Sequence, residues 1–494
     1  MRILSCDELV TLLGRWSGGR GALYLLLAAR LRLLIDEGQI RAGTTLPTDR
    51  ALALALAVGR STIISAYDVL RQEGRIVRRQ GSGTQVADTR APSAPTGAEG
   101  SMNTLFLHLM EPSDDIVQLG CAAPTTPPPE LAEAYRSAVD RFVGDVGADI
   151  GYHPAGLAEL RAAIARSYTA RGVPTGPEQV MITTGAQQAL ALITSTFLTS
   201  GNGVVCETPS YPGALELFRE AGAVISGAEC GPAGLDHAEF LRLLARDHTR
   251  LGYLIPTHQN PTGAVLPPLV RRRIVLRAAE LGVPLVEDET LAELGFHDLA
   301  PPPLASYAPD GDILTVGSLS KLVWGGLRVG WVRAPASRIA RLARVKALHD
   351  MGSPVLAQRA VLELLPHLPQ LRARRVAELR VCHDRLRERL AERLPDWTPR
   401  PVTGGQTLWV RLPHGSASAF AQIALRQGIA LLAGPGFSVR GDCDDHLRIP
   451  FLRGPDELTA VVDRLAEMWQ KFAANRPSTV IGEVLTPPGA ATKV

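Results

Sequence analysis

The tetrapeptide Ser318-Leu-Ser-Lys321, followed seven residues later by Arg328, could hold a carbonyl cofactor through its lysine. Lysine is rare here, with four among 52 basic residues, and Lys321 follows the apolar run 313–319. A lysine amine becomes a nucleophile when burial and nearby cations lower its pKa, and it then forms a Schiff base with a cofactor such as pyridoxal phosphate. The spacing predicts that Lys321 is this lysine and that Ser318 and Arg328 bind the phosphate. On the tetrapeptide alone, a surface lysine after a strand is an equal alternative.

Two upstream segments place polar side chains after apolar runs. Asn260 follows the run 251–256 in a Gln-Asn-Pro-Thr-Gly turn, where its amide can donate to a phenolate oxygen. Asp288 ends the run 283–288, and the carboxyl ends of strands in an open α/β sheet border the ligand crevice. A carboxylate there can keep a pyridine nitrogen protonated. Taken singly, Asn260 lies in a common turn and Asp288 could equally cap the next helix.

Together these residues resemble the site of the fold type I aminotransferases, over roughly residues 115–475. The resemblance rests on a set of residues in this order: Gly185, Ala186, Gln187, Tyr211, Asn260, Asp288, Ser318, Lys321, Arg328 and Arg448. It implies that Lys321 carries the cofactor, that Asp288 pairs with the pyridine nitrogen, that Asn260 binds the ring oxygen and that Tyr211 stacks on the ring. It also implies an α/β fold, with a large domain built on a mostly parallel sheet and a smaller C-terminal α+β subdomain.

The same resemblance assigns the charged ends of the cofactor and substrate. The amides of Gly185, Ala186 and Gln187, at a helix N-terminus, would hold the phosphate together with Ser318 and Arg328. Tyr152 resembles the tyrosine that reaches the phosphate of a neighbouring subunit. Arg448 resembles the arginine that binds the substrate carboxylate, a task for which its planar guanidinium is well shaped.

Two positions depart from the pattern. Regulator-type relatives carry a tyrosine two residues after the aspartate, and Thr290 stands at that place. Gln406 replaces an expected apolar residue and indicates a modified pocket. Both changes argue against a fast transaminase.

The first 87 residues predict a second kind of domain. An amphipathic helix over 23–37 closes at Gly38, a second helix ends at Gly59, a third runs from Arg60 to about residue 73, and a hairpin follows around Gly-Ser-Gly. This order closely resembles the winged helix-turn-helix of GntR-type regulators. The resemblance implies that a set of residues faces double-stranded DNA, with Arg60 reading a base edge: Arg50, Arg60, Ser61, Thr62, Gln80 and Gly81. A solvated helix face is the alternative for each arginine.

Charge and composition agree with this division. Residues 1–87 hold 12 arginines against 7 acids, whereas the remainder holds 40 basic and 42 acidic residues. The length of 494 residues predicts several domains, and the six cysteines form no zinc-binding pattern, so we expect no metal. We expect a cytoplasmic protein without a membrane partner, with domains at 1–87 and 115–475, a flexible linker at 88–114 and a disordered tail at 476–494.

A winged helix joined to an aminotransferase-like body resembles the MocR (GabR-like) branch of the GntR family. That resemblance implies a homodimeric transcription regulator in which pyridoxal phosphate, and an amino compound that forms an external aldimine with it, control binding to DNA. At most a weak half-reaction is then expected. The alternative is an aminotransferase with an accessory N-terminal domain.

Overall fold

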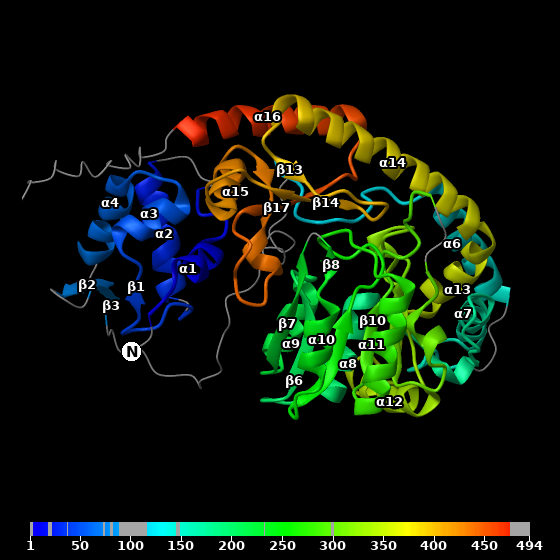
Figure 1. Cartoon of the computed structure of the whole chain (residues 1–494). Coiled ribbons are helices and arrows are strands. Elements are labelled where there is room, and N and C mark those ends of the chain that lie inside the picture. The colour runs from blue at the N-terminus through cyan, green and yellow to red at the C-terminus, as the bar shows by residue number, and fades with distance from the viewer. Residues whose placement is uncertain are drawn as a thin grey trace, which may run out of the picture.

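The computed structural model describes residues 3–17, 22–36, 38–72, 75–79, 83–87, 116–144, 149–231, 233–297 and 301–474. The predicted linker and tail, and the DNA-contact candidates Gln80 and Gly81, lie outside these residues. Figure 1 shows three parts: a small N-terminal domain, a large domain on a central sheet, and a C-terminal subdomain above that sheet.

The N-terminal domain combines four helices with a small antiparallel sheet in the order β1-β3-β2. Its elements are α1 (Cys6–Leu13), α2 (Leu23–Asp36), β1 (Thr45–Leu46), α3 (Asp49–Leu56), α4 (Arg60–Gln72), β2 (Ile76–Arg79) and β3 (Gly83–Val86). Side chains cap two of the helices: Ser5 and Glu8 form a capping box on α1, and the Thr48 hydroxyl accepts from Ala51 N at the start of α3. Among the described residues no single helix is long and apolar enough to cross a membrane.

The large domain is built on an eight-stranded sheet in the order β5-β12-β11-β10-β9-β6-β7-β8. The strands are β5 (Val180–Thr183), β6 (Gly203–Thr208), β7 (Val224–Gly231), β8 (Gly234–Leu235), β9 (Thr249–Leu254), β10 (Leu285–Asp288), β11 (Ile313–Ser318) and β12 (Gly330–Arg333). The central pairs, from β7 through β6, β9 and β10 to β11, are parallel, whereas β8 and β12 pair antiparallel with their neighbours.

Helices cover both faces of this sheet, which explains why its strands are apolar on both sides. One face packs on α8 (Ala186–Phe197), α9 (Pro212–Glu220) and α12 (Ala336–Asp350). The other packs on α6 (Pro129–Gly144), α7 (Ala158–Ala170), α10 (His237–Leu244), α11 (Pro268–Leu281) and α13 (Val355–Leu364). Neighbouring side chains of β6 illustrate the alternation, because Val204 joins the first core and Val205 the second.

The C-terminal subdomain follows the long helix α14 (Leu368–Arg393), which packs against α16 (Pro455–Ala474) above the subdomain (Figure 1). Its sheet has the order β13-β14-β17-β16 and is joined by α15 (Ala417–Arg426). The strands are β13 (Thr398–Pro399), β14 (Thr407–Arg411), β16 (Leu432–Ala433) and β17 (His446–Pro450). In addition, β4 (Val117–Gln118) pairs parallel with β15 (Ile429–Ala430), so the chain enters the body of the molecule at this subdomain.

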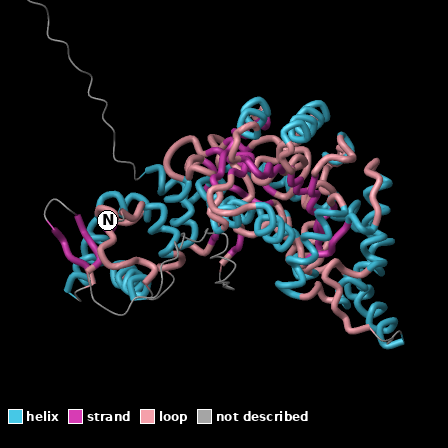
Figure 2. Tube along the Cα trace, turned by 90° about the horizontal axis from the view of Figure 1, so that it is seen from below, coloured by secondary structure: helices cyan, strands magenta, loops and turns pink. Residues whose placement is uncertain are grey.

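The predicted fold class is confirmed, with a mostly parallel α/β sheet, a smaller α+β subdomain and an N-terminal winged helix-turn-helix. In Figure 2 the strands of the N-terminal domain lie at one end of the molecule, apart from the strands of the other two parts.

Candidate functional site

The predicted cofactor residues converge at the carboxyl ends of the parallel strands. Asp288 ends β10, Ser318 ends β11, and Asn260 follows β9 within the same edge of the sheet. Lys321 follows Ser318 in the next turn, and Arg448 reaches the site from β17 of the C-terminal subdomain. Residues that are far apart in the sequence are therefore brought together where the large domain meets this subdomain, at the strand ends where open α/β sheets bind ligands.

Lys321 is half-buried, and its Nζ donates to the carbonyl oxygen of Ala122 at 2.5 Å. Burial lowers the pKa of Lys321, and the nearby Arg448 guanidinium lowers it further, whereas Cys121 and Asp288 oppose this effect. A lowered pKa leaves more of the amine uncharged and nucleophilic near neutral pH. The side chain thus has the electrostatic setting that Schiff-base formation requires.

Asp288 is buried and receives three hydrogen bonds. The Tyr253 hydroxyl donates to Oδ2 at 3.0 Å, while the backbone N–H and hydroxyl of Thr290 donate to Oδ1 at 3.0 and 2.7 Å. Burial raises the pKa of Asp288, and these hydrogen bonds oppose the rise because they favour the carboxylate. The Thr290 hydroxyl is therefore engaged with the aspartate. Tyr253 was missed by the sequence reasoning, although a tyrosine inside the apolar run 251–256 is a usable signal.

A candidate anion cradle lies at the N-terminus of α8. Gly185 is the N-cap with φ 101°, and a Cβ added there would lie 3.0 Å from the Arg328 guanidinium. The glycine thus supplies both the backbone conformation and the room for that guanidinium. Arg328 donates to the carbonyls of Thr184 and Gly325, and the Ser318 hydroxyl accepts from Ser320 N at 3.1 Å. A helix N-terminus, a guanidinium and a hydroxyl form a donor set that fits a phosphate.

Tyr211 and Gln187 support each other beside this cradle. The Tyr211 hydroxyl donates to Gln187 Oε1 at 3.0 Å, and Gln187 Nε2 donates to Gly213 O at 3.0 Å. Burial and the nearby Asp288 raise the pKa of Tyr211 to about 12, so its phenol stays neutral. The side chain of Gln187 thus positions Tyr211. The backbone N–H groups of Ala186 and Gln187 lie in the first turn of α8, where helix N–H groups have no partner within the helix.

Arg448, in β17, is buried. Its guanidinium donates to Gly120 O and to Asn260 Oδ1, the latter at 3.4 Å, and lies 5.0 Å from the Phe437 ring centroid. Burial lowers the pKa of Arg448 to about 10. A buried guanidinium that is held mainly by neutral acceptors is suited to an anionic ligand such as a carboxylate. The carbonyls of Gly120 and Ala122 were not foreseen, because backbone groups leave no residue-type signal.

Two further positions that the sequence singled out, Gln406 and Tyr152, differ in their surroundings. Gln406 Nε2 donates to the backbone carbonyl of Lys321 at 3.1 Å, so it helps to fix the backbone at the lysine. Tyr152 is 62% exposed in the loop before α7, and its role toward a neighbouring subunit stays a prediction.

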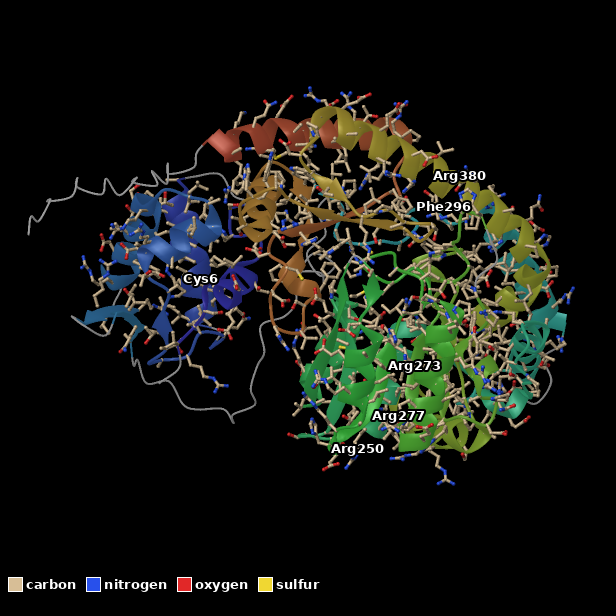
Figure 3. The ribbon with its side chains drawn as sticks, viewed as in Figure 1. Cys6, Arg250, Arg273, Arg277, Phe296 and Arg380 are labelled. Carbon is tan, nitrogen blue, oxygen red and sulfur yellow. The ribbon has the colours of Figure 1, made fainter. Side chains whose placement is uncertain are left out.

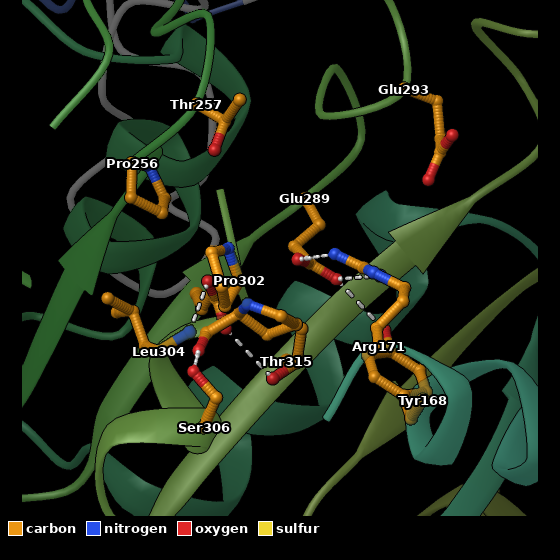
Figure 4. A network of polar contacts seen from close by, with 12 residues as sticks. Tyr168, Arg171, Pro256, Thr257, Glu289, Glu293, Pro302, Leu304, Ser306 and Thr315 are labelled. Carbon is orange, nitrogen blue, oxygen red and sulfur yellow. Dashed lines mark hydrogen bonds and ion pairs between the residues drawn. The ribbon is translucent and has the colours of Figure 1, made fainter. Parts of the chain in front are cut away.

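A partly buried ion pair fixes the chain just beyond Asp288 (Figure 4). Glu289 accepts from both terminal nitrogens of Arg171, at 3.1 and 2.6 Å, and from the Tyr168 hydroxyl at 3.2 Å. Trp331 Nε1 in turn donates to the Tyr168 hydroxyl at 3.0 Å. This network ties α7 to the end of β10, and it therefore limits the movement of Asp288.

The candidate DNA interface lies at α3 and α4. Arg50, in α3, is exposed, and Arg60, Ser61 and Thr62 form the first turn of α4. Arg60 is 65% exposed, and its guanidinium donates to Asp49 Oδ2 at 3.0 Å. Many other arginines lie elsewhere: Figure 3 shows Arg250, Arg273 and Arg277 on the large domain, away from the N-terminal domain.

Two family models match the chain. The model of bacterial regulatory proteins of the gntR family matches residues 23–86, and that of aminotransferase class I and II matches residues 114–465. Relatives of both kinds exist. The HTH-type transcriptional regulator YisV of Bacillus subtilis is 29% identical over 84% of this chain and 89% of its own length. The 2-aminoadipate transaminase of Thermus thermophilus is 34% identical over 67% of this chain and 84% of its own length.

Solved structures agree with the second match. LysN, an alpha-aminoadipate aminotransferase of Thermus thermophilus, was solved with N-(5'-phosphopyridoxyl)-L-leucine. It is 30% identical with a TM-score of 0.68, covering 75% of this chain and 95% of its own. Pyridoxal phosphate, the cofactor that the sequence predicts, is thus the cofactor of this family. The chain belongs to the aminotransferase class I and II family and, because a GntR-type DNA-binding domain precedes that body, to the MocR branch of the GntR transcription regulators.

Proposed function

We propose that this protein binds operator DNA through its winged helix and that pyridoxal phosphate, together with an amino acid, controls this binding. When bound, the cofactor supplies an aldehyde for the amine and an electron-withdrawing ring. The observation that carries the proposal is that Lys321, Asp288 and Arg448 lie within electrostatic reach of one another. They belong to an effector body whose C-terminal subdomain also contacts the DNA-binding domain.

Each side chain has a separate task in this proposal. Lys321 holds the cofactor covalently, and Asp288, supported by Tyr253, keeps the ring nitrogen protonated. Asn260 presents its amide nitrogen to the ring oxygen while its Oδ1 accepts from Arg448. The phosphate binds at the N-terminus of α8 with Arg328 and Ser318, and the carboxylate of the amino acid binds Arg448.

We further propose a homodimer. Exposed apolar side chains gather beside the site: Ile150, Tyr152, Leu348 and Met351. Segments 150–153 and 348–352 are neighbours, since a Cβ added at Gly352 would lie 2.7 Å from His153 O. Gln188, in the first turns of α8, donates to Asp350 at 2.6 Å. Contact between two copies at this surface would cover apolar side chains and bring the partner close to the phosphate cradle.

A second candidate, transamination, is favoured by the complete set of cofactor residues and by the 34% identical transaminase. The hydroxyl of Thr290 donates its hydrogen bond to Asp288, so it is not free to donate to the ring oxygen. We therefore expect turnover below about 1 s⁻¹, the lower end of ordinary enzymes.

The deciding experiment measures both outputs on one preparation. The cofactor-loaded protein is titrated onto DNA fragments from beside its own gene, with and without a panel of amino acids, and keto-acid release is followed in parallel. A change in DNA affinity with slow release supports the regulator. Turnover above about 1 s⁻¹ with DNA binding that ignores cofactor and amino acid favours the enzyme.

A further inference from the structure

Arg426 forms hydrogen bonds that link the C-terminal subdomain to the DNA-binding domain. Arg426, the last residue of α15, donates from its two terminal nitrogens to Leu56 O at 2.7 Å and to Ala57 O at 3.0 Å. These carbonyls end α3, and Ala57 is its left-handed C-cap with φ 50°. A cation at a helix C-terminus satisfies orphan carbonyls and interacts favourably with the helix dipole. Arg426 therefore holds the turn that leads from α3 into α4, the helix predicted to enter DNA.

A second contact region lies at α1. A cavity of about 270 Å³ separates α1 from the C-terminal subdomain, with Asp7 and Thr11 on one side and η5 (Gly434–Phe437) on the other. Leu425, beside Arg426, also lines it. The two parts also interact electrostatically. Burial raises the pKa of Asp7 in α1, and the negative charge of Asp444 in the C-terminal subdomain raises it further. Thus η5, together with α15, forms part of the wall of the effector body that faces α1.

The opposite side of η5 belongs to the cofactor site. The Phe437 ring lies under the guanidinium of Arg448, and Phe437 O accepts from Ser210 N at 2.8 Å. Tyr211 packs against the cluster of Phe437, Trp409 and Leu432. One short segment therefore contacts the residues predicted to bind the ring and the carboxylate on one side, and borders the cavity below α1 on the other.

We propose that η5 transmits occupancy of the cofactor site to the docking of the DNA-binding domain, with Arg426 as the latch. A ring placed on Tyr211, or a carboxylate placed on Arg448, changes the contacts of both residues with Phe437. Because close-packed segments shift between discrete arrangements, η5 then changes the wall that faces α1. A ligand can shift docking only by its differential affinity for the docked and undocked arrangements. The regulatory meaning of this coupling rests on the proposed function, whereas the coupling itself does not.

The latch is tested by amide hydrogen exchange on the full chain. Arg426→Ala removes both hydrogen bonds, so exchange in α1 and α3 should become about tenfold faster, the factor that corresponds to about 1.4 kcal/mol. Arg426→Lys, which keeps the positive charge but loses the planar pair of terminal nitrogens, should give a smaller increase. The matched control is Arg464→Ala, because Arg464 donates to Gln427 O within the effector body. Exchange in α1 and α3 that is the same in Arg426→Ala and in the control would overturn the latch.

The route through η5 is tested with pyridoxal phosphate as the probe. Adding it to cofactor-stripped wild-type protein should change exchange in α1 and α3. Phe437→Leu, which keeps an apolar side chain but loses the ring under Arg448, should reduce this change at least threefold while visible absorbance reports normal cofactor uptake. An undiminished response in Phe437→Leu would refute the route.

DNA affinity measured on the same samples separates the two proposals. If exchange responds to the cofactor and DNA affinity does not, the coupling stands and the proposed function fails. If DNA affinity responds and exchange in α1 and α3 does not, the proposed function stands and the coupling fails.

Discussion

At the scale of single residues, the site depends on side chains whose protonation is set by burial. Desolvation and the charge of Arg448 lower the pKa of Lys321. Burial raises the pKa of Asp288, and the hydrogen bonds from Tyr253 and Thr290 oppose that rise. The two groups lie within electrostatic reach of each other, so a change at either alters the pKa of its neighbour.

Lys321→Ala should abolish the visible absorbance of the cofactor-loaded protein, because no other lysine among the described residues lies at this site. Far-ultraviolet circular dichroism should show that the fold survives. Lys471→Ala is the control, since Lys471 is an exposed lysine of α16. An unchanged visible spectrum in Lys321→Ala would show that the Schiff-base assignment is wrong.

Arg60→Ala should cost about 1–3 kcal/mol of binding free energy at one base position and relax specificity there. Asp49→Ala should have a smaller effect of the same kind, because Asp49 orients the Arg60 guanidinium. The control is Arg71→Ala, near the far end of α4, where Arg71 pairs with Asp68. The measurement is binding to a library of operator variants, and a preference retained in full by Arg60→Ala would exclude base reading.

At the scale of elements, much of the site could be predicted because strand ends are visible in the sequence. Apolar runs that finish in Asp288 and Ser318 place those side chains at one edge of the sheet, and a glycine before an apolar helix marks the phosphate cradle at Gly185. The contribution of Gly120 and Ala122 could not be predicted, since it comes from backbone carbonyls. Arg426 could not be predicted either, because an arginine at a helix end is usually solvated and only the docked domain gives it partners.

The strands also bury carboxyls that the site does not use. Glu207 in β6 accepts from Ile255 N at 2.8 Å, and burial raises its pKa from 4.5 to about 8. Between pH 4.5 and about pH 8, Glu207 is therefore protonated in the folded protein and ionised in the unfolded chain. The free energy of unfolding falls as the pH rises through this range.

Glu207→Gln should therefore lessen the fall in melting temperature between pH 5 and pH 8. We expect a difference of a few degrees, since 1 kcal/mol corresponds to about 2–4 °C in a domain of 150–250 residues. Glu220→Gln, at an exposed position of α9, is the control. Equal slopes for wild type and Glu207→Gln in calorimetry would contradict a carboxyl that is protonated in the folded state.

At the scale of the whole molecule, cofactor binding and DNA binding belong to parts that meet at α15 and η5. The proposed dimer surface lies elsewhere, around α12 and the loop before α7. A dimer would thus present two docked DNA-binding domains, and their spacing would select operators with a matching half-site separation.

Leu348→Arg should convert the dimer to monomers, because it places a charge among apolar side chains that the second copy would cover. Leu348 is 88% exposed in the single chain, and Leu269 on α11 is similarly exposed, at 80%. Leu269→Arg, which lies away from the proposed dimer surface, is therefore the matched control. Sedimentation velocity gives the mass of each variant. A Leu348→Arg variant that remains dimeric would show that the subunits associate through another surface.

The pairing of β4 with β15 has a consequence for how strong the dock must be. Residues 88–115 join the end of the DNA-binding domain to β4, and β15 begins three residues after Arg426. The covalent connection is thus anchored beside the docking arginine, and such tethers give effective concentrations on the order of millimolar. An interface with an intrinsic dissociation constant of about 0.1 mM would then be closed about ten times as often as it is open. A weak dock of this kind is the one that a small ligand can most easily open or close.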